Sequence, residues 1–344
     1  MASKINFTPL LDTLRLEKID DATYFSKQYS NYISNSRLSL INPSQGGSPE
    51  QFFFKGFKTT YSPAFQLGSA VHQKVLQDDL FEICQSIDKP TAKVGALADL
   101  LYNICKGEIP TPEQIKEQAK VIDYYGGNLS ENQINTVIAK SKVYWTSRRE
   151  FESTYTGSRE LIYLDPRSRE TVSNCVEAIN SNKKIQSLLH PSDSVSDVIS
   201  ENEQAILLDI RVDIENTQPF ILKLKAKLDN YTIDPLTEVI TVNDVKTIGK
   251  FVSEMEGNIE KFHYNREFAV YSYLLSKCAE KYYNIVNPTI KGNYLCVSTI
   301  PKYYTKVIPL TKTMFRQGMK EFQYCMNLIA YNVATKYKDF GIWI

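Results

Sequence analysis

The distribution of apolar and polar residues changes near residue 200. The segment from Ala205 to Ile214 ends in apolar/polar alternation, and Phe220 to Asp229 alternates again, as strands with one buried face do. Residues 216–219 turn the chain between them, and Asp234-Pro235 turns it again before a third segment, Glu238 to Lys246. The pattern predicts three consecutive antiparallel strands.

Residues from about 66 to 190 follow a helical pattern instead. Thr111-Pro112-Glu113-Gln114 and Ser130-Glu131-Asn132-Gln133 each place a capping hydroxyl three residues before a Gln, which is the signature of a capping box. After the three strands we expect a helix over about 254–278, short strands over 294–298 and 304–310, and a final helix over 312–335.

These elements predict an α/β fold, with a central mixed β-sheet flanked by helices and a largely helical N-terminal half. We expect a single domain over residues 1–344. Residues 1–200 would form its mostly helical part, and residues 201–344 would form the sheet core and the C-terminal helices.

Composition excludes several classes of protein. Hydrophobic residues make up 42% of the chain and charged residues 23%, so disorder is excluded. Lys and Arg total 40 against 39 Asp and Glu, which rules out a wholly basic surface but not a basic face. No apolar run reaches the roughly 18 residues of a membrane span, and the first eleven residues lack the pattern of a signal peptide. We therefore expect a cytoplasmic protein without a membrane partner.

The sequence also limits the metal chemistry. The six cysteines form no CxxC pair, the three histidines form no HxxxH or HExxH, and no GxxxxGK[ST] or GxGxxG loop is present. Buried free thiols are the better interpretation of the cysteines. A metal ion in this protein would have to be held mainly by carboxylates.

Two strand ends offer such carboxylates. Asp229 ends the second predicted strand, and Asp244 and Lys246 share a face at the end of the third because strand side chains repeat every two residues. Antiparallel pairing can bring Asp229 and Asp244 together around Mg²⁺ or Mn²⁺. Lys246 would then orient a water and offset charge on a phosphate.

The alternative is that these are strand-end acids on a solvated face, which the spacing alone supports nearly as well. Asp244-Val245-Lys246 is, however, the one place in the chain where Asp or Glu stands two residues before Lys. Lys223 and Lys225 on the second strand either follow a DNA backbone or line a solvated strand edge.

Several segments together resemble a known family. Asp229, a turn and Asp244-Val245-Lys246-Thr247 are similar to the core of the PD-(D/E)XK nucleases. Further segments resemble the RecE-type exonucleases, which are related to phage lambda exonuclease and are encoded by phages or prophages: Tyr32 to Leu38 with Pro43 and Phe52-Phe53-Phe54, Gln66 to His72, Lys227-Leu228-Asp229, and Tyr264 to Tyr271. Glu267 stands where the family has a glutamine.

The resemblance implies a central sheet of the PD-(D/E)XK nuclease type and a site built on it. His72, Asp229 and Asp244 would bind one or two Mg²⁺ (or Mn²⁺) ions, with the Val245 carbonyl as an added ligand, and Lys246 would position the attacking water. A further set of residues would contact the substrate: Tyr264, Glu267, Tyr271 and Lys225. Glu201 or Glu203 would supply an additional acid.

The resemblance also implies an activity and partners. We expect a metal-dependent exonuclease that degrades linear double-stranded DNA from 5′ to 3′ for recombination in a bacterial host cell. Double-stranded DNA ends, a single-strand annealing protein and a homo-oligomeric ring would be its partners. An endonuclease or repair nuclease of the same fold and a catalytically silent DNA-binding protein remain alternatives. The other interpretation of His72 is a core histidine. The other interpretation of Tyr264, Glu267 and Tyr271 is a packing stripe on one helical face.

Overall fold

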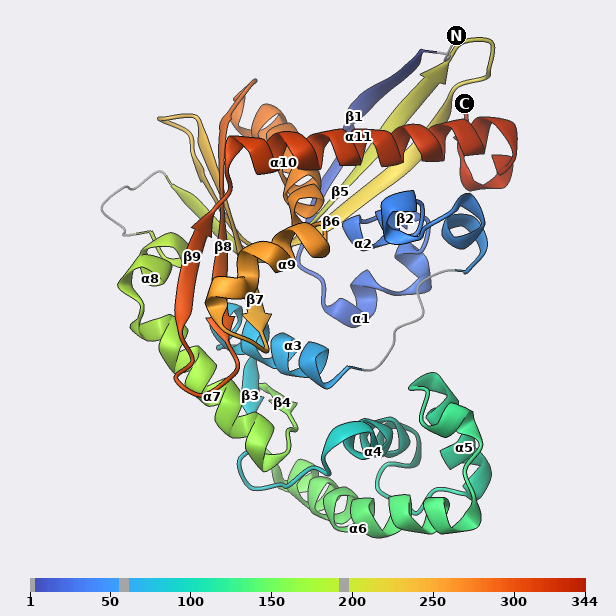
Figure 1. Cartoon of the computed structure of the whole chain (residues 1–344), viewed down its shortest axis with the longest axis vertical. Helices are drawn as coiled ribbons and strands as arrows, with labels where there is room; N and C mark the ends of the chain where they lie inside the picture. Colours follow the sequence, from blue (N-terminus) through green and yellow to red (C-terminus); the bar gives the residue numbers. More distant parts are fainter. Residues whose placement is uncertain (1–3, 56–61, 192–197) are drawn as a thin grey trace.

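The computed structural model describes residues 4–55, 62–191 and 198–344 (Figure 1). Its centre is a mixed sheet with the main path β1-β5-β6-β7-β8-β9, along which neighbouring strands are antiparallel except β7 and β8. The strands of this path are β1 (Ile5–Glu17), β5 (Ile199–Ile214), β6 (Phe220–Asp234), β7 (Val239–Ile248), β8 (Thr289–Ser298) and β9 (Thr305–Pro309). The predicted α/β class and the three consecutive antiparallel strands are confirmed.

The sheet forks between β6 and β7. These strands pair only from Asp234↔Val239 to Asn230↔Asn243, whereas β6 continues along β5 and β7 continues along β8. Beyond the fork, two short strands pair with the start of β6: β2 (Tyr32–Ile33) opposite residues 223–224, and β10 (Ile342–Trp343) opposite residues 220–221. On this edge of β6, residues 225–229 therefore have no strand partner in the part of the chain that the structure describes.

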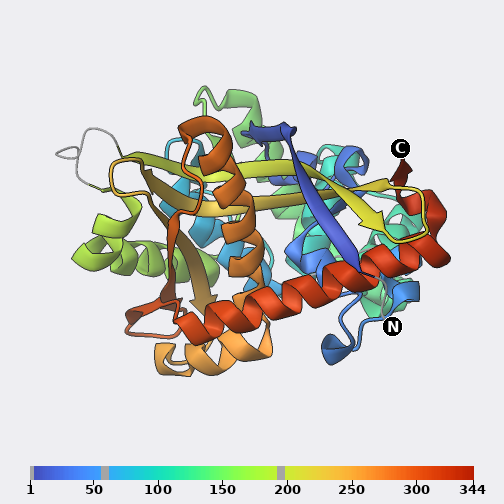
Figure 2. The ribbon, with the colours of Figure 1, turned by 90° about the horizontal axis from the view of Figure 1, so that it is seen from above.

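Helices cover both faces of the sheet. On one face α10 (Tyr264–Tyr283) and α11 (Lys312–Thr335) share the main core with β5, β6 and β7, and Figure 2 shows α11 running along this side of the molecule. The two helices approach closely because residue 318 is glycine: a Cβ there would lie 2.0 Å from the Asn265 carbonyl oxygen. On the other face α3 (Pro63–Leu76), α7 (Pro166–Ser181) and α8 (Lys183–Leu189) pack against Val245, Leu295 and Val297.

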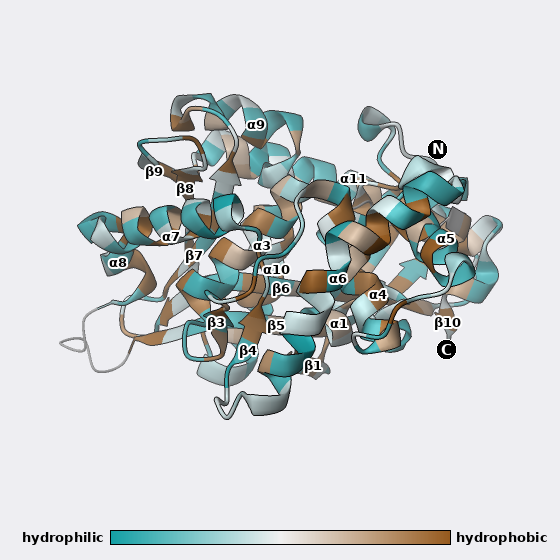
Figure 3. Ribbon diagram, turned by 90° about the horizontal axis from the view of Figure 1, so that it is seen from below, coloured by the Kyte–Doolittle hydropathy of each residue, from teal (hydrophilic) through white to brown (hydrophobic). Residues whose placement is uncertain are grey.

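The remaining helices form a separate core away from the sheet (Figure 1). There α4 (Ala92–Cys105), α5 (Pro112–Val121) and α6 (Glu131–Thr154) surround Leu97, Leu101 and Trp145. Both predicted capping boxes are present at the starts of α5 and α6. Figure 3 shows hydrophobic and hydrophilic residues alternating along α6 and α7, as helices with one buried face require. The helical pattern of this half is confirmed.

Short elements complete the described chain. They are α1 (Asp21–Tyr24), α2 (Asn35–Leu38), α9 (Met255–Lys261), the parallel pair β3 (Phe81–Ile83) and β4 (Glu160–Ile162), the π-helix at Gln51–Lys55, and the 3-10 helices Lys27–Tyr29, Pro43–Gln45, Tyr125–Gly127, Val252–Glu254 and Lys338–Phe340. No helix among the described residues combines the length and apolar character needed to cross a membrane.

Several elements differ from the sequence prediction. Asp229 does not end its strand, since β6 continues five residues further, to Asp234. The helix expected over 254–278 is divided into α9 and α10, because His263 adopts a left-handed backbone with φ of 56°. The long N-terminal strand β1 was missed, since its polar and apolar residues alternate only in part and its pairing with β5 shifts register between Leu10 and Arg15.

A buried arginine ties several of these elements together. Arg266, at the start of α10, is fully buried and donates hydrogen bonds to Asn35 Oδ1, Gln45 Oε1, Ser39 Oγ and Glu321 Oε1 at 2.7–3.0 Å. Its guanidinium thus links α10 to α2, to the 3-10 helix after it, and to α11.

We expect Arg266→Met to lower the free energy of unfolding by about 3 kcal/mol, because it leaves Glu321 partly buried beside fewer donors. Urea unfolding measures the change. The matched control is Arg211→Met, which removes a surface pair with Asp213 and should cost less than about 1 kcal/mol. Equal losses in the two variants would contradict the structural role of Arg266.

Candidate active site

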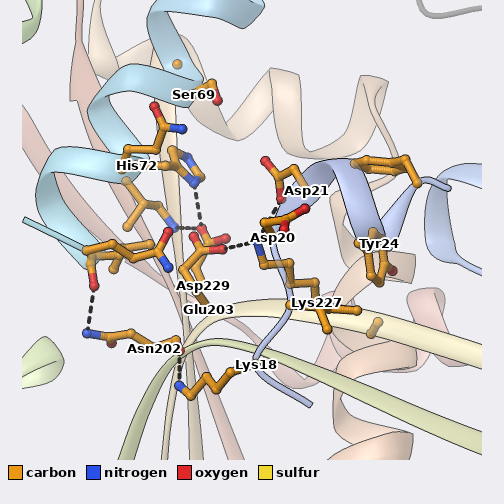
Figure 4. Close-up of a pocket in the computed structure, with 18 of the residues that line it drawn as sticks. Lys18, Asp20, Asp21, Tyr24, Ser69, His72, Asn202, Glu203, Lys227 and Asp229 are labelled. Carbon is orange, nitrogen blue, oxygen red and sulfur yellow. Dashed lines mark hydrogen bonds and ion pairs between the residues drawn. The ribbon is translucent and has the colours of Figure 1, made fainter. Parts of the chain in front are cut away.

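A cleft of about 1660 Å³ opens at the fork of the sheet. Strand β6 contributes Lys227 and Asp229, β7 contributes Val245 to Thr247, and the helices α1, α3 and α10 supply further walls. Figure 4 shows His72 of α3, Glu203 of β5, and Asp229 and Lys227 of β6 pointing into this space. The cleft lies where β6 lacks a strand partner. Polar groups of β6 and β7 are therefore left uncovered there, and they line the cleft.

The first part of the site joins α3 to β6. His72 Nδ1 lies 3.4 Å from Asp229 Oδ2, and the Val245 backbone N–H donates to the same oxygen at 2.7 Å. That N–H is available because β7 has left β6 at the fork. Gly68, one helical turn before His72, lets α3 approach β7, since a Cβ at Gly68 would lie 3.0 Å from Thr247 Oγ1. The glycine therefore allows the histidine to reach the carboxylate.

A second carboxylate joins this pair. Glu203 lies between the β5/β6 pairs Asn202↔Asn230 and Gln204↔Leu228, and its backbone has a φ of 49°, which is rare for a residue other than glycine inside a strand. One ligand atom from each of His72, Glu203 and Asp229 lies within 4.8 Å of the other two. We call these three residues the cleft cluster. Glu203 is thus the acid that the sequence offered only as an alternative to Glu201.

Charges in the cleft cluster are strongly perturbed. Burial lowers the pKa of His72, but the charge of Asp229 and its hydrogen bond outweigh burial and raise that pKa to about 9. Burial would raise the pKa of Asp229, but His72, Lys246 and the Val245 N–H hold it below its usual value. Burial and the nearby Asp229 charge raise the pKa of Glu203. Two close carboxylates with one imidazole form a donor set that fits a divalent cation.

Beside the cleft cluster, Lys246 is the centre of a separate ion-pair cluster. Lys246 Nζ lies 2.8 Å from Asp244 Oδ2 and 3.1 Å from Glu267 Oε2, and 4.6 Å above the ring of Tyr264. Glu267 Oε1 accepts a hydrogen bond from the Tyr271 hydroxyl at 3.0 Å. Burial lowers the pKa of Lys246, but the surrounding carboxylates outweigh burial and raise it well above its usual value. Lys246 is therefore cationic and held in place.

The structure places Asp244 apart from the cleft cluster. Its side chain is buried, it does not line the cleft, and burial together with the charges of Glu267 and Asp229 raises its pKa well above the usual value. Oδ2 accepts no well-directed hydrogen bond, although Lys246 Nζ is close to it. A buried carboxylate oxygen without such a donor can be satisfied by a cation. Asp244 and the Val245 carbonyl as metal ligands stay predictions.

The four residues expected to contact substrate divide into two groups. Tyr264, Glu267 and Tyr271 line the cleft, on the face of α10 that the sequence indicated. Lys225 does not line it: the side chain is buried, donates to the Tyr24 carbonyl at 2.6 Å, and sits 4.1 Å above the Tyr24 ring. Burial lowers the pKa of Lys225 to about 8. This placement gives Lys225 a structural contact with α1 and offers no support for a contact with DNA.

Sequence patterns gave no signal for Asp21, an acid that α1 brings to the cleft. Asp21 of α1 reaches Lys227 Nζ at 2.7 Å, and Lys227 also pairs with Glu203 at 2.8 Å. Acidic side chains outnumber cationic ones among the lining residues, since His72 and lysines 18, 227 and 246 face Asp20, Asp21, Asp79, Glu160, Glu201, Glu203, Asp229 and Glu267. A phosphate would be repelled from this cleft unless cations were also bound in it.

Comparisons with known proteins give little further information. No protein-family model matches the chain, and no curated protein matches it. The chain is similar to a solved structure of a proposed exonuclease from Eubacterium rectale, with 10% sequence identity, a TM-score of 0.46, and coverage of 93% of this chain and 89% of the other. Similarity at this level supports no assignment of function.

We expect the Asp229→Asn substitution to lower the pKa of His72 from about 9 to 6.5 or below, because burial is then opposed only by more distant charges. NMR titration in metal-free buffer measures this pKa, with His190 as an internal control. In the wild type the raised pKa stabilises the fold fully below pH 6.5, and this stabilisation is lost as pH rises toward 9. An unchanged His72 titration in Asp229→Asn would mean that the two side chains are not paired in solution.

Proposed function

We propose that the protein is a divalent-metal-dependent nuclease that hydrolyses phosphodiester bonds of DNA. The observation that carries the proposal is the convergence of the cleft cluster with the Lys246 ammonium in one cleft, at the fork between β6 and β7. Carboxylates that hold metal ions beside a fixed cation are the groups that phosphodiester hydrolysis uses. The order of these groups along the chain agrees with the resemblance to PD-(D/E)XK nucleases.

The cleft cluster would hold the metal, with Mg²⁺ or Mn²⁺ as the ion. His72 would present a neutral ring nitrogen, so the proton that Asp229 stabilises has to leave before the ion binds. The Val245 N–H holds Asp229 in orientation through the 2.7 Å hydrogen bond. Asp244 and the Val245 carbonyl are further candidates as ligands. A bound divalent ion supplies Lewis acidity and makes a water molecule more acidic.

Lys246 supplies the fixed positive charge of the reaction. It lines the cleft next to Asp229 in the fork, and two carboxylates and the Tyr264 ring hold its ammonium in one position. From there it can orient the attacking water and offset the negative charge that grows on the phosphate. Because Glu267 is ion-paired to Lys246, the acid at this position is compatible with a nuclease although the family has a glutamine.

The acid-rich lining favours a metal-dependent enzyme over a silent DNA-binding protein. A protein that only bound DNA would gain affinity from basic side chains, and carboxylates dominate this cleft. With ions bound, the negative charge of the cleft falls, and a phosphate can enter beside lysines 227 and 246. We therefore place catalysis, rather than simple binding, at the fork.

We extend the proposal to a 5′ to 3′ exonuclease that acts on linear double-stranded DNA in phage or prophage recombination. This finer statement rests on the resemblance to RecE-type exonucleases. A homo-oligomeric ring around the duplex and a single-strand annealing protein as partner belong to the same proposal. A ring would also collect basic side chains from several copies of a chain whose net charge is only +1.

We expect the purified protein to release nucleotides from linear duplex DNA in the presence of Mg²⁺ or Mn²⁺, and to be inactive with EDTA. Labelling of one 5′ end determines the polarity, and closed circular DNA separates exonuclease from endonuclease activity. Asp229→Asn should abolish cleavage. The control Asp213→Asn, in an exposed pair with Arg211, should not change it. Cleavage that persists in EDTA would contradict the proposed metal site.

We expect Lys246→Ala to raise the activation barrier by about 2–4 kcal/mol, because one preorganised charge is removed. Lys246→Arg should restore little of the lost cleavage rate, since a planar guanidinium cannot replace a compact ammonium between two carboxylates. Single-turnover cleavage of linear duplex at saturating Mg²⁺ measures both effects.

Lys250→Ala is the matched control for Lys246. Lys250 lies four residues further along and pairs with Glu254 at the surface, so its loss should leave the rate unchanged. Circular dichroism checks that Lys246→Ala stays folded with Asp244 and Glu267 left unpaired. A folded Lys246→Ala protein that cleaves DNA at the wild-type rate would remove Lys246 from the reaction.

A further inference from the structure

Four asparagines form a row of hydrogen bonds across the sheet. Asn230 Nδ2 donates to Asn202 Oδ1 at 2.7 Å, Asn243 Nδ2 donates to Asn230 Oδ1 at 2.7 Å, and Asn293 Nδ2 donates to Asn243 Oδ1 at 2.9 Å. The four residues lie directly opposite one another on β5, β6, β7 and β8. We call this row the asparagine ladder.

The asparagine ladder also bonds to two helices. Asn243 Nδ2 donates to the Leu188 carbonyl of α8 at 3.0 Å, and Asn202 Nδ2 donates to the Leu76 carbonyl at 3.2 Å. Leu76 is the last residue of α3, one turn after His72. The ladder thus fixes four strands and the C-terminal end of the helix that carries the histidine.

Amide side chains in this position need an explanation. Asn230 and Asn243 are 0% exposed, although burying an amide costs free energy and only its hydrogen bonds offset that cost. Apolar side chains would pack the same space at less cost, but they would tolerate a shift of strand register. An amide row is satisfied in one register, so it specifies which residues lie opposite one another.

The asparagine ladder lies at the fork of the sheet. Asn230↔Asn243 is the last residue pair between β6 and β7. Asp229 and Asp244 are the next residues on each strand, and Glu203 directly follows Asn202. Each of the three acids of the proposed site therefore adjoins one member of the ladder.

We propose that Asn202, Asn230 and Asn243 are positioning residues, and that the asparagine ladder fixes the point where β6 and β7 separate and with it the spacing of Glu203, Asp229 and Asp244 for metal binding. This inference rests on the proposed function. If the asparagine ladder were loosened, β6 and β7 could lose their last residue pair. Asp229 would then move relative to the Val245 N–H and to His72. Outer groups that orient metal ligands affect metal affinity about 10-fold to 100-fold when they are removed.

The experiment measures Mn²⁺ affinity by calorimetry at low temperature, without DNA. Asn230→Ala and Asn243→Ala should weaken Mn²⁺ binding by about 10-fold or more. Asn243→Thr should recover part of the loss, because its hydroxyl can still donate to one neighbour and accept from Asn293. The Mn²⁺ concentration that gives half-maximal cleavage should increase by the same factor in each variant.

A control separates positioning from general stability. Trp145→Phe removes the buried hydrogen bond from Trp145 Nε1 to the Ala98 carbonyl, in the helical core away from the sheet. It should lower the unfolding midpoint while leaving Mn²⁺ affinity unchanged. The increase in midpoint on adding Mn²⁺ gives a second measure of affinity for any variant that is less stable.

Two results would overturn the inference, and they are distinguishable. If Asp229→Asn weakens Mn²⁺ binding but Asn230→Ala and Asn243→Ala bind Mn²⁺ as tightly as the wild type, the metal site stands and the asparagine ladder has no positioning role. If Asp229→Asn itself leaves Mn²⁺ affinity unchanged, the proposed metal site fails, and the role of the ladder fails with it.

Discussion

The separation of β6 from β7 is the constraint on which the rest of the site depends. A fully paired sheet would satisfy the Val245 N–H and would leave no space between the strands. Because pairing stops at Asn230↔Asn243, that N–H is available to Asp229, and Ala226, Lys227 and Asp229 of β6 line a cleft. The same divergence lets α3 bring His72 to Asp229, with Gly68 providing the room. The end of pairing between β6 and β7 thus creates the cavity and leaves polar groups accessible inside it.

Electrostatic repulsion inside the cleft is the second determinant of what the site can bind. Carboxylates from three strands and from α1 and α10 are collected in one space, and the described structure balances them locally with His72, Lys227 and Lys246. Under the proposed function, such a cleft would attract divalent cations and would repel DNA until cations are present. The order of binding, metal before phosphate, would follow from this distribution of charge.

The two halves of the chain contribute to the site in different ways. The sheet and α10 supply Glu203, Asp229, Lys246 and the two tyrosines of α10, whereas the N-terminal half supplies His72 and the wall formed by α1. Arg266 connects the two, because its guanidinium bonds to residues of α2 and α11 while Glu267, the next residue, faces Lys246. A buried polar contact of this kind fixes how α10 is placed relative to the segment before α3.

Much of this arrangement was present in the sequence alone. Local alternation and capping boxes were enough to predict the strands β5, β6 and β7, the helical N-terminal half, and the α/β class. Strand periodicity was enough to place Asp229 and Asp244-Val245-Lys246 near strand ends, because that period is a local property. His72 was selected by the resemblance to the nuclease family and not by any period. Local pattern also placed Tyr264, Glu267 and Tyr271 on one face of a helix.

Tertiary structure decided the rest. Glu201 and Glu203 both line the cleft, but Glu203, at a left-handed backbone position, is the one that lies close to His72 and Asp229. The burial of Lys225 depends on α1, whose Tyr24 carbonyl accepts its hydrogen bond from 201 residues away in sequence. The ion-pair cluster of Lys246 joins Asp244 of the same strand to Glu267, an acid that only the packing of α10 brings there. These outcomes are set by long-range contacts and by where the sheet divides, and no period in the sequence encodes the place at which two strands stop pairing.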